Sequence, residues 1–224
     1  MPLELTYYFK GEVIPKTKMS NLRHLDLTDF PFNGDISSLV EFKSLTSLTL
    51  RHFLGDISPL AQLKSLTYLD LHYFNRDISP LSQLKSLTYL DLHNFNGDIS
   101  ALSELTSIIY LDLSSFKGDI CPLSNLTSVY SLDLFSFNGD ISPLRNLKSL
   151  VSLDLHYFNG DISPLSESFS LRFLYLDSFK GDISPLLELN SFDGDVSPLF
   201  NLSSLTHLNL DSLKKEKYIF KQLG

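Results

Sequence analysis

The sequence repeats itself every 21 residues. The string Asp56-Ile57-Ser58-Pro59-Leu60 returns 21 residues later as Asp77-Ile78-Ser79-Pro80-Leu81. The aspartate that opens this string recurs at the same interval at Asp35, Asp56, Asp77, Asp98, Asp119, Asp140, Asp161 and Asp182. A fixed period of this length is the signature of a solenoid, in which each repeat packs only against its two neighbours. The sequence therefore predicts one elongated repeat domain.

Each repeat divides into a strand half and a turn half. From Leu66 to His72, apolar Leu69 and Leu71 alternate with polar neighbours, which is the period of a strand with one buried face. Phe74 and Ile78 then mark the inward points of a turn. We expect the glycine of the turn to supply a left-handed backbone, as in Asn96-Gly97, Asn138-Gly139 and Asn159-Gly160, although Arg76 replaces it in one copy.

The end of each repeat is expected to form a single short helical or 3₁₀ turn. Ser79 stands where an N-cap should be, and Pro80 stands where a first helical residue should be. Leucines follow at three-residue spacing, but about seven residues are too few for a full helix. The aspartate two residues before each serine, such as Asp77, is expected to accept backbone N–H groups of its own turn. Cys121, which replaces the serine of its repeat, is expected to be inert.

A phenylalanine marks the inward point of each turn. We predict that these rings stack into a spine inside the solenoid: Phe53, Phe74, Phe95, Phe116, Phe137, Phe158 and Phe179.

The Leu-x-x-Leu-x-Leu pattern, followed by an inward residue, resembles the leucine-rich-repeat family over nearly the whole chain. The Asp-Ile-Ser-Pro-Leu string is similar to bacterial internalins and to phosphatase-regulatory repeat proteins. Phe-x-Gly-x-Ile resembles plant-type repeats, and the Phe-Asn start resembles FNIP repeats, so the subclass stays open. The phenylalanine column departs from most such families, which place a buried asparagine ladder there. The resemblance implies a right-handed, β-rich α/β solenoid with a concave parallel sheet and a convex side of short 3₁₀ turns, and it implies partner recognition.

Irregular spacing divides the single domain into four segments. They are an N-terminal partial repeat (1–21), regular repeats (22–186), truncated and terminal repeats (187–213) and a C-terminal cap (214–224). The truncation is indicated by Asp182 and Asp195, which are only 13 residues apart. Strands are expected around Glu188 and from Leu205 to Leu210.

Composition excludes several classes of function. The formal net charge of −8 argues against nucleic-acid binding, which needs clustered lysine and arginine. No apolar stretch approaches the ~20 residues that span a bilayer. One cysteine allows no internal disulfide, and the first thirty residues show no signal-peptide pattern, so we expect a monomeric cytoplasmic protein. Lys64, Lys85 and Lys148 are expected as solvated charges on the convex edge.

The strand half suggests a binding surface, because residues at one repeat position should form columns ~4.8 Å apart across the sheet. One column is mostly aspartate, and its neighbours are rich in tyrosine and histidine, a mixture typical of binding surfaces. The candidate residues are Tyr68, Asp70, His72, Tyr73, Tyr89, Asp91, His93, Tyr110, Asp112, Asp133, Phe135, Asp154, His156 and Tyr157. The histidines and tyrosines are all expected on strand segments. The alternative interpretation is that the aspartates are consensus copied by tandem duplication and that exposed strands simply favour aromatic residues.

Catalysis is not expected. Asp70 and His72 lie two apart on a strand and could suggest a metal site, but no cysteine pair, nucleophile with a base, or glycine-rich phosphate loop accompanies them. We therefore predict a non-catalytic protein–protein interaction module, without cofactor or metal, whose concave face binds a partner with a basic patch. The alternative is a carbohydrate or polar-ligand binder that uses the tyrosine and aspartate columns as a narrow aromatic-lined site.

Overall fold

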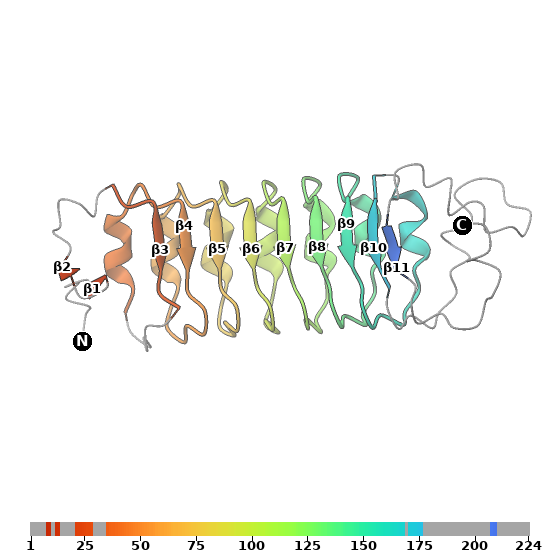
Figure 1. Ribbon diagram of the computed structural model, residues 1–224, viewed down its shortest axis with the longest axis horizontal. Helices are drawn as coiled ribbons and strands as arrows, with labels where there is room; N and C mark the ends of the chain where they lie inside the picture. Colours follow the sequence, from red (N-terminus) through yellow and green to blue (C-terminus); the bar gives the residue numbers. More distant parts are fainter. Residues whose placement is uncertain are drawn as a thin grey trace, which may run out of the picture.

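Nine short strands form one parallel sheet that runs the length of the molecule (Figure 1). The computed structural model describes residues 8–9, 12–13, 21–28, 35–168, 170–176 and 207–209. The strands are stacked in the order β11-β10-β9-β8-β7-β6-β5-β4-β3. Their bounds are β3 (His24–Asp26), β4 (Ser47–Thr49), β5 (Tyr68–Asp70), β6 (Tyr89–Asp91), β7 (Tyr110–Asp112), β8 (Ser131–Asp133), β9 (Ser152–Asp154), β10 (Phe173–Tyr175) and β11 (His207–Asn209). The predicted β-rich solenoid with a parallel sheet is confirmed.

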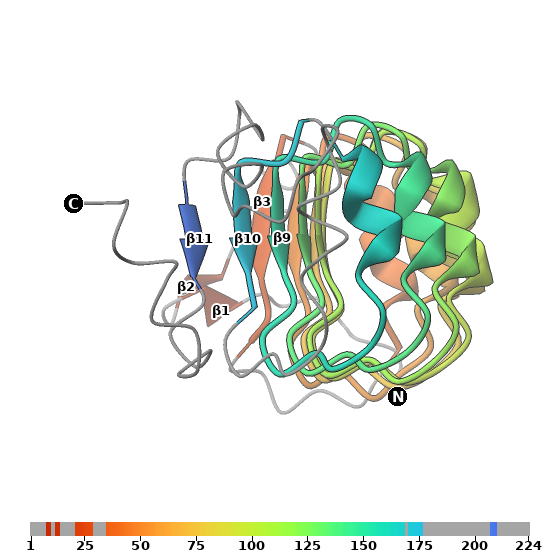
Figure 2. The ribbon, with the colours of Figure 1, turned by 90° about the vertical axis from the view of Figure 1, so that its right-hand side faces the viewer.

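Short 3₁₀ segments lie on the side opposite the sheet, as the end-on view shows (Figure 2). Each spans five residues: η1 (Ser37–Glu41), η2 (Ser58–Gln62), η3 (Ser79–Gln83), η4 (Ser100–Glu104), η5 (Cys121–Asn125), η6 (Ser142–Asn146) and η7 (Ser163–Glu167). The exposed Lys85 and Lys148 on this side pair with the glutamates Glu104 and Glu167 of the next repeat. The predicted 3₁₀ turns and solvated lysines are confirmed.

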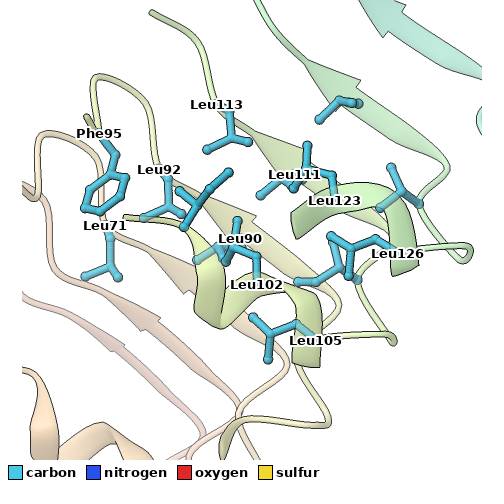
Figure 3. Packing of buried hydrophobic residues seen from close by; sticks show 14 of the residues in the cluster. Leu71, Leu90, Leu92, Phe95, Leu102, Leu105, Leu111, Leu113, Leu123 and Leu126 are labelled. Carbon is cyan, nitrogen blue, oxygen red and sulfur yellow. The ribbon is translucent and has the colours of Figure 1, made fainter. Parts of the chain in front are cut away.

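The core lies between the sheet and the 3₁₀ segments and continues from repeat to repeat (Figure 3). Leu90 and Leu92 enter it from the strand side, and Leu102 and Leu105 enter it from the 3₁₀ side. All four are at most 1% exposed. Each repeat therefore depends on its neighbours to cover its apolar layer, as in other solenoids.

The phenylalanine spine is also present. Six of the seven predicted rings lie in the described residues and are at most 3% exposed: Phe53, Phe74, Phe95, Phe116, Phe137 and Phe158. The rings of Phe53 and Phe74 stack with a centroid distance of 6.4 Å. Phe179 lies outside the described residues.

The expectation for the turn glycines was wrong, because the left-handed backbone lies elsewhere in the turn. The residue before each spine phenylalanine adopts it: His52, Tyr73, Asn94, Ser115, Ser136 and Tyr157, with φ between 57° and 67°. Glycine is needed for a different reason. A Cβ added to Gly97 would lie 2.6 Å from Cζ of Phe95, and the same close approach recurs at Gly118 with Phe116. The glycine makes room for the spine ring.

The capping expectation needs a second correction. Ser79 is the first residue of η3, and the N-cap position belongs to Ile78, whose side chain makes no capping hydrogen bond. Asp77 provides the cap instead: its carboxylate accepts the Ser79 N–H at 2.8 Å and the Ser79 hydroxyl at 2.7 Å. The role predicted for the aspartates is thus confirmed. At Cys121 the equivalent Asp119 accepts a hydrogen bond from the thiol and raises its pKa, which agrees with an inert cysteine.

The two ends of the array are described only in part. β11 pairs in parallel with β10, which confirms the last predicted strand. The strand expected around Glu188 lies outside the described residues. Near the N-terminus, β1 (Tyr8–Phe9) pairs antiparallel with β2 (Glu12–Val13), and the partial repeat proposed for 1–21 stays a prediction. The proposed cap, 214–224, lies outside the described residues.

Candidate interaction surface

The first and third residues of each strand carry the side chains of the outer face of the sheet, while the middle leucine is buried. In-register pairing of β5, β6 and β7 aligns Tyr68 with Tyr89 and Tyr110. The same pairing places Asp70, Asp91, Asp112, Asp133 and Asp154 side by side in the next column. The predicted tyrosine and aspartate columns are therefore adjacent rows on one face.

The three tyrosine rings form a stacked ladder. Ring centroids lie 4.2 Å apart for Tyr68 and Tyr89 and 4.4 Å apart for Tyr89 and Tyr110, with nearly parallel planes. Burial raises the pKa of Tyr110 to about 12 and also raises that of Tyr68 and Tyr89, so the ladder is uncharged at neutral pH. Each ring covers the face of its neighbour, and the ladder presents mainly ring edges to an incoming molecule.

The aspartates have a structural role. Leu71 N–H and Tyr73 N–H donate to carbonyls of the next repeat, which leaves the His72 N–H outside that ladder. Asp70 Oδ1 accepts it at 3.0 Å. The same bond, from an aspartate to the N–H two residues later, recurs at 2.8–2.9 Å at Asp26, Asp91, Asp112, Asp133 and Asp154. This geometry gives a physical reason why aspartate recurs at this position in six of the nine strands, as the consensus interpretation requires.

The carboxylates of the aspartate column are also less exposed to solvent than an acidic surface patch would be. Asp70 is fully buried and forms an ion pair with Arg51, whose Nε lies 2.6 Å from Asp70 Oδ2. The side chains of Asp91 and Asp112 are 11% and 13% exposed. Burial raises the pKa of Asp91, Asp112 and Asp133, and repulsion between neighbouring carboxylates adds to it. The acidic column thus lies partly beneath the rows that flank it.

The histidine row lies just beyond the strands, which corrects the expectation that it belongs to them. His72 and His93 each follow the end of their strand by two residues, and their rings stack at 4.3 Å with an interplanar angle of 3°. Nδ1 of His72 lies 3.9 Å from Asp91 Oδ1, and Nδ1 of His93 lies 4.0 Å from Asp112 Oδ1. Burial lowers the pKa of His72, and the adjacent His93 lowers it further.

Tyr73 and Tyr157 also lie beyond the strands, at left-handed positions of the turn. Both rings are largely exposed. The rings of Tyr157 and Phe135 pack edge to face, with their centroids 5.3 Å apart. His156 Nδ1 lies 2.6 Å from Asp154 Oδ1. The rows of turn side chains therefore extend the outer face of the sheet along its length.

The set of candidate residues predicted from the sequence lacks one group of exposed apolar side chains. Ile109 and Tyr130, which directly precede the first residues of β7 and β8, are about half exposed. A signal was present in the sequence, because threonine occupies this position in the three preceding repeats. Arg51, the ion-pair partner of Asp70, was also left out of the candidate set.

In the part of the chain that the structure describes, no three histidine, cysteine, aspartate or glutamate side chains gather closely enough to hold a metal ion. The described segments also contain no helix of the length and apolarity needed to cross a membrane.

Comparisons with known proteins agree with this geometry. No family model matches the sequence, and no curated protein matches it. Among solved structures, internalin C2 from Listeria monocytogenes superposes with a TM-score of 0.67 at 26% identity, covering 89% of this chain and 85% of that one. Internalin InlF from the same organism gives a TM-score of 0.64 at 27% identity, covering 89% of this chain and 70% of that one. The chain has the leucine-rich-repeat fold.

The same leucine-rich-repeat fold is found in a plant protein. The plant peptide hormone receptor RGFR1, in complex with RGF2, matches with a TM-score of 0.53 at 19% identity. The match covers 72% of this chain and 27% of the receptor. At this identity the likeness shows the fold alone.

Proposed function

We propose that this leucine-rich-repeat protein is a non-catalytic protein–protein interaction module, and that the outer face of its sheet binds a partner with a basic patch. The observation that carries the proposal is the concentration of aromatic rings, imidazoles and carboxylates on that face in adjacent, regularly spaced rows. A preformed rigid surface of this kind loses little conformational freedom on binding. As expected from the sequence, the proposal places the chain in the cytoplasm as a monomer.

A protein partner is favoured over a carbohydrate by the tyrosine ladder. A sugar stacks on the face of an aromatic ring, but both faces of Tyr89 are covered by Tyr68 and Tyr110. The ladder offers edges and hydroxyl groups along an extended row, which suits a broad contact more than a narrow aromatic-lined site.

A basic partner is favoured by the charge of the face. Arg51 neutralises Asp70 at one end of the aspartate column. Asp133 lies between Asp112 and Asp154; burial raises its pKa, and repulsion from these two carboxylates raises it further. A lysine or arginine brought by a partner would relieve this repulsion, and the net charge of −8 would speed the approach of a cationic surface.

Replacing Asp91 and Asp112 together with asparagine should weaken and slow partner association while leaving the fold intact. Asparagine keeps the oxygen that accepts the N–H of His93 or Ser114 but removes the charge. The partner would be captured from a lysate of the source organism, and its association rate would be measured by surface plasmon resonance at several salt concentrations. The rate for the wild type should fall as salt rises, and that of the variant should depend less on salt.

The matched control is a Lys64→Gln, Lys85→Gln double variant on the opposite side, where both ammonium groups bond to the next repeat. It should bind like the wild type. Unchanged binding by the aspartate variant, or loss confined to the lysine variant, would contradict the proposal.

Partner binding should also weaken as the pH falls below about 6.5. The pKa of His72 is lowered in the folded protein, so the neutral ring is the favoured form. The neutral His72 ring contributes fully to the stability of the folded protein at pH values above the pKa of histidine in the unfolded chain. This contribution is lost as the pH falls through the lowered pKa of the folded state. Protonation of His72 then adds positive charge, which repels a cationic partner. On further acidification, Asp91 and Asp112 lose their negative charge at a higher pH than ordinary aspartates, because their pKa values are raised.

The dissociation constant measured from pH 8 to pH 5 tests this prediction. A His72→Gln, His93→Gln double variant should show a shallower pH dependence than the wild type. Equal slopes for the two proteins would show that the imidazole row takes no part.

A further inference from the structure

The outer face changes character between β7 and β8. Thr67 and Thr88 precede β5 and β6, and each hydroxyl donates to a backbone carbonyl of the preceding repeat. At the same position the next repeats carry Ile109, Tyr130 and Val151. The first residue of the strand changes as well, because the tyrosine ladder ends at β7 and is followed by Ser131 and Ser152.

This change creates an exposed apolar surface at both ends of β8. Ile109 and Tyr130 are 49% and 51% exposed on the side where β8 begins, and Phe135 and Tyr157 are 36% and 50% exposed on the side where it ends. Clusters of exposed apolar side chains on a soluble protein commonly mark interaction sites. We name this surface the β8 patch, and it consists of Ile109, Tyr130, Ser131, Phe135, Ser152 and Tyr157.

Carboxylates lie between the two apolar ends. Asp133, on β8, is flanked by Asp112 and Asp154 on the adjacent strands. None of these three is paired with a lysine or arginine among the described residues; Asp112 and Asp154 face His93 and His156 instead. The other half of the face differs, because Arg51 pairs with Asp70 there. Arg172 follows Val151 in the same column and bounds the patch on the β10 side.

The geometry points to a specific occupant, and this inference rests on the proposed function. We propose that the β8 patch binds a segment of a partner protein that carries a lysine or arginine between two apolar side chains. The basic group would lie over Asp133, and the apolar side chains would contact Tyr130 and Phe135. These residues are five positions apart, and at about 3.3 Å per residue an extended segment of five to six residues would span them.

A second copy of this chain is a poorer occupant. Two such faces would bring rows of carboxylates against each other, and the net charge of −8 would oppose their approach.

The test is selection of phage-displayed random peptides on the full chain, followed by calorimetric titration of an enriched synthetic peptide. The enriched sequences should combine apolar residues with lysine or arginine. Binding should weaken by at least about tenfold in a Tyr130→Ser, Phe135→Ser variant. It should be unchanged in a Leu54→Ser variant, which removes a similarly exposed apolar side chain that belongs to neither the candidate surface nor the patch. Both variants should keep the wild-type melting temperature because all three side chains are exposed.

The other outcomes separate the two proposals. If peptides lose binding in a Tyr73→Ser variant and not in the patch variant, the outer face is retained and the β8 patch is rejected. Acidic consensus sequences, or no enrichment, would overturn the inferred occupant. Loss of peptide binding only in the Lys64→Gln, Lys85→Gln variant would contradict the proposed function itself. Sedimentation of the free chain as a dimer that the patch variant abolishes would assign the patch to self-association.

Discussion

Replacing Phe95 with alanine should lower the free energy of unfolding by about 3–5 kcal/mol. The ring is fully buried in the spine, and its removal leaves a cavity between two neighbouring repeats. Folded domains are typically stable by only roughly 5–15 kcal/mol, so this is a large share of the total. Because solenoid stability is carried by contacts between adjacent repeats, the loss should extend to the repeats on either side.

Urea denaturation followed by circular dichroism measures this effect. Phe135→Ala is the matched control, since it makes the same chemical change at a ring exposed on the outer face, and it should cost less than about 1 kcal/mol. Equal midpoints for wild type and Phe95→Ala would show that the spine does not hold the repeats together.

Gly118→Ala should destabilise the protein by about 1–3 kcal/mol. The added Cβ would lie 2.6 Å from Cζ of Phe116, closer than carbon atoms can approach, so the buried ring or the turn has to move. Thermal unfolding with the alanine variant measures the loss.

A double-mutant cycle with Phe116→Leu identifies the cause. With the ring replaced by leucine, Gly118→Ala should cost little, and the two substitutions should be strongly non-additive. Arg76→Gly tests the same position in reverse: Arg76 does not have a left-handed backbone, so any gain must come from removing a Cβ that crowds the spine ring. This relief should offset the freedom that glycine adds to the unfolded chain, so stability should stay equal or rise by up to ~1 kcal/mol. A purely additive cycle would mean that the glycine is required for some reason other than the ring.

The repeat made most of the fold predictable. Strict spacing of Leu69, Leu71, Phe74 and Ile78 identifies inward positions regardless of the details of each turn, because every copy repeats the same pattern. The strands, the 3₁₀ segments, the phenylalanine spine and the last strand followed from that pattern. Where the pattern breaks, after Asp182, the strand expected around Glu188 lies outside the described residues.

The turns were predicted less well, because residue preference alone does not assign a role. Glycine suggests a positive φ, but in these turns it is favoured because a Cβ would crowd the phenylalanine ring beneath it. Serine before proline suggests an N-cap, but the serine is itself the first residue of the 3₁₀ segment, and the aspartate two residues earlier accepts its N–H. Tyr73 adopts a left-handed backbone despite its bulk, and only the surrounding repeats impose that conformation.

The candidate surface was predicted as a set of columns but not as a set of contacts. Register follows from the period, so the neighbours of Asp91 could be named from the sequence. Its low exposure and the stacking of His72 on His93 depend on side-chain packing, which the period does not specify. The exposure of Ile109 and Tyr130 was not predicted, because the alternating strand pattern does not specify how far the residues directly before each strand are covered.

Amide hydrogen exchange of the chain with and without its captured partner tests the central claim most directly, because protection maps the contact surface segment by segment. We predict that partner binding slows amide hydrogen exchange in and just after strands β5 to β9, with little change in the 3₁₀ segments η2 to η6. Protection confined to the 3₁₀ segments, with the strands and the turns that follow them unchanged, would contradict it.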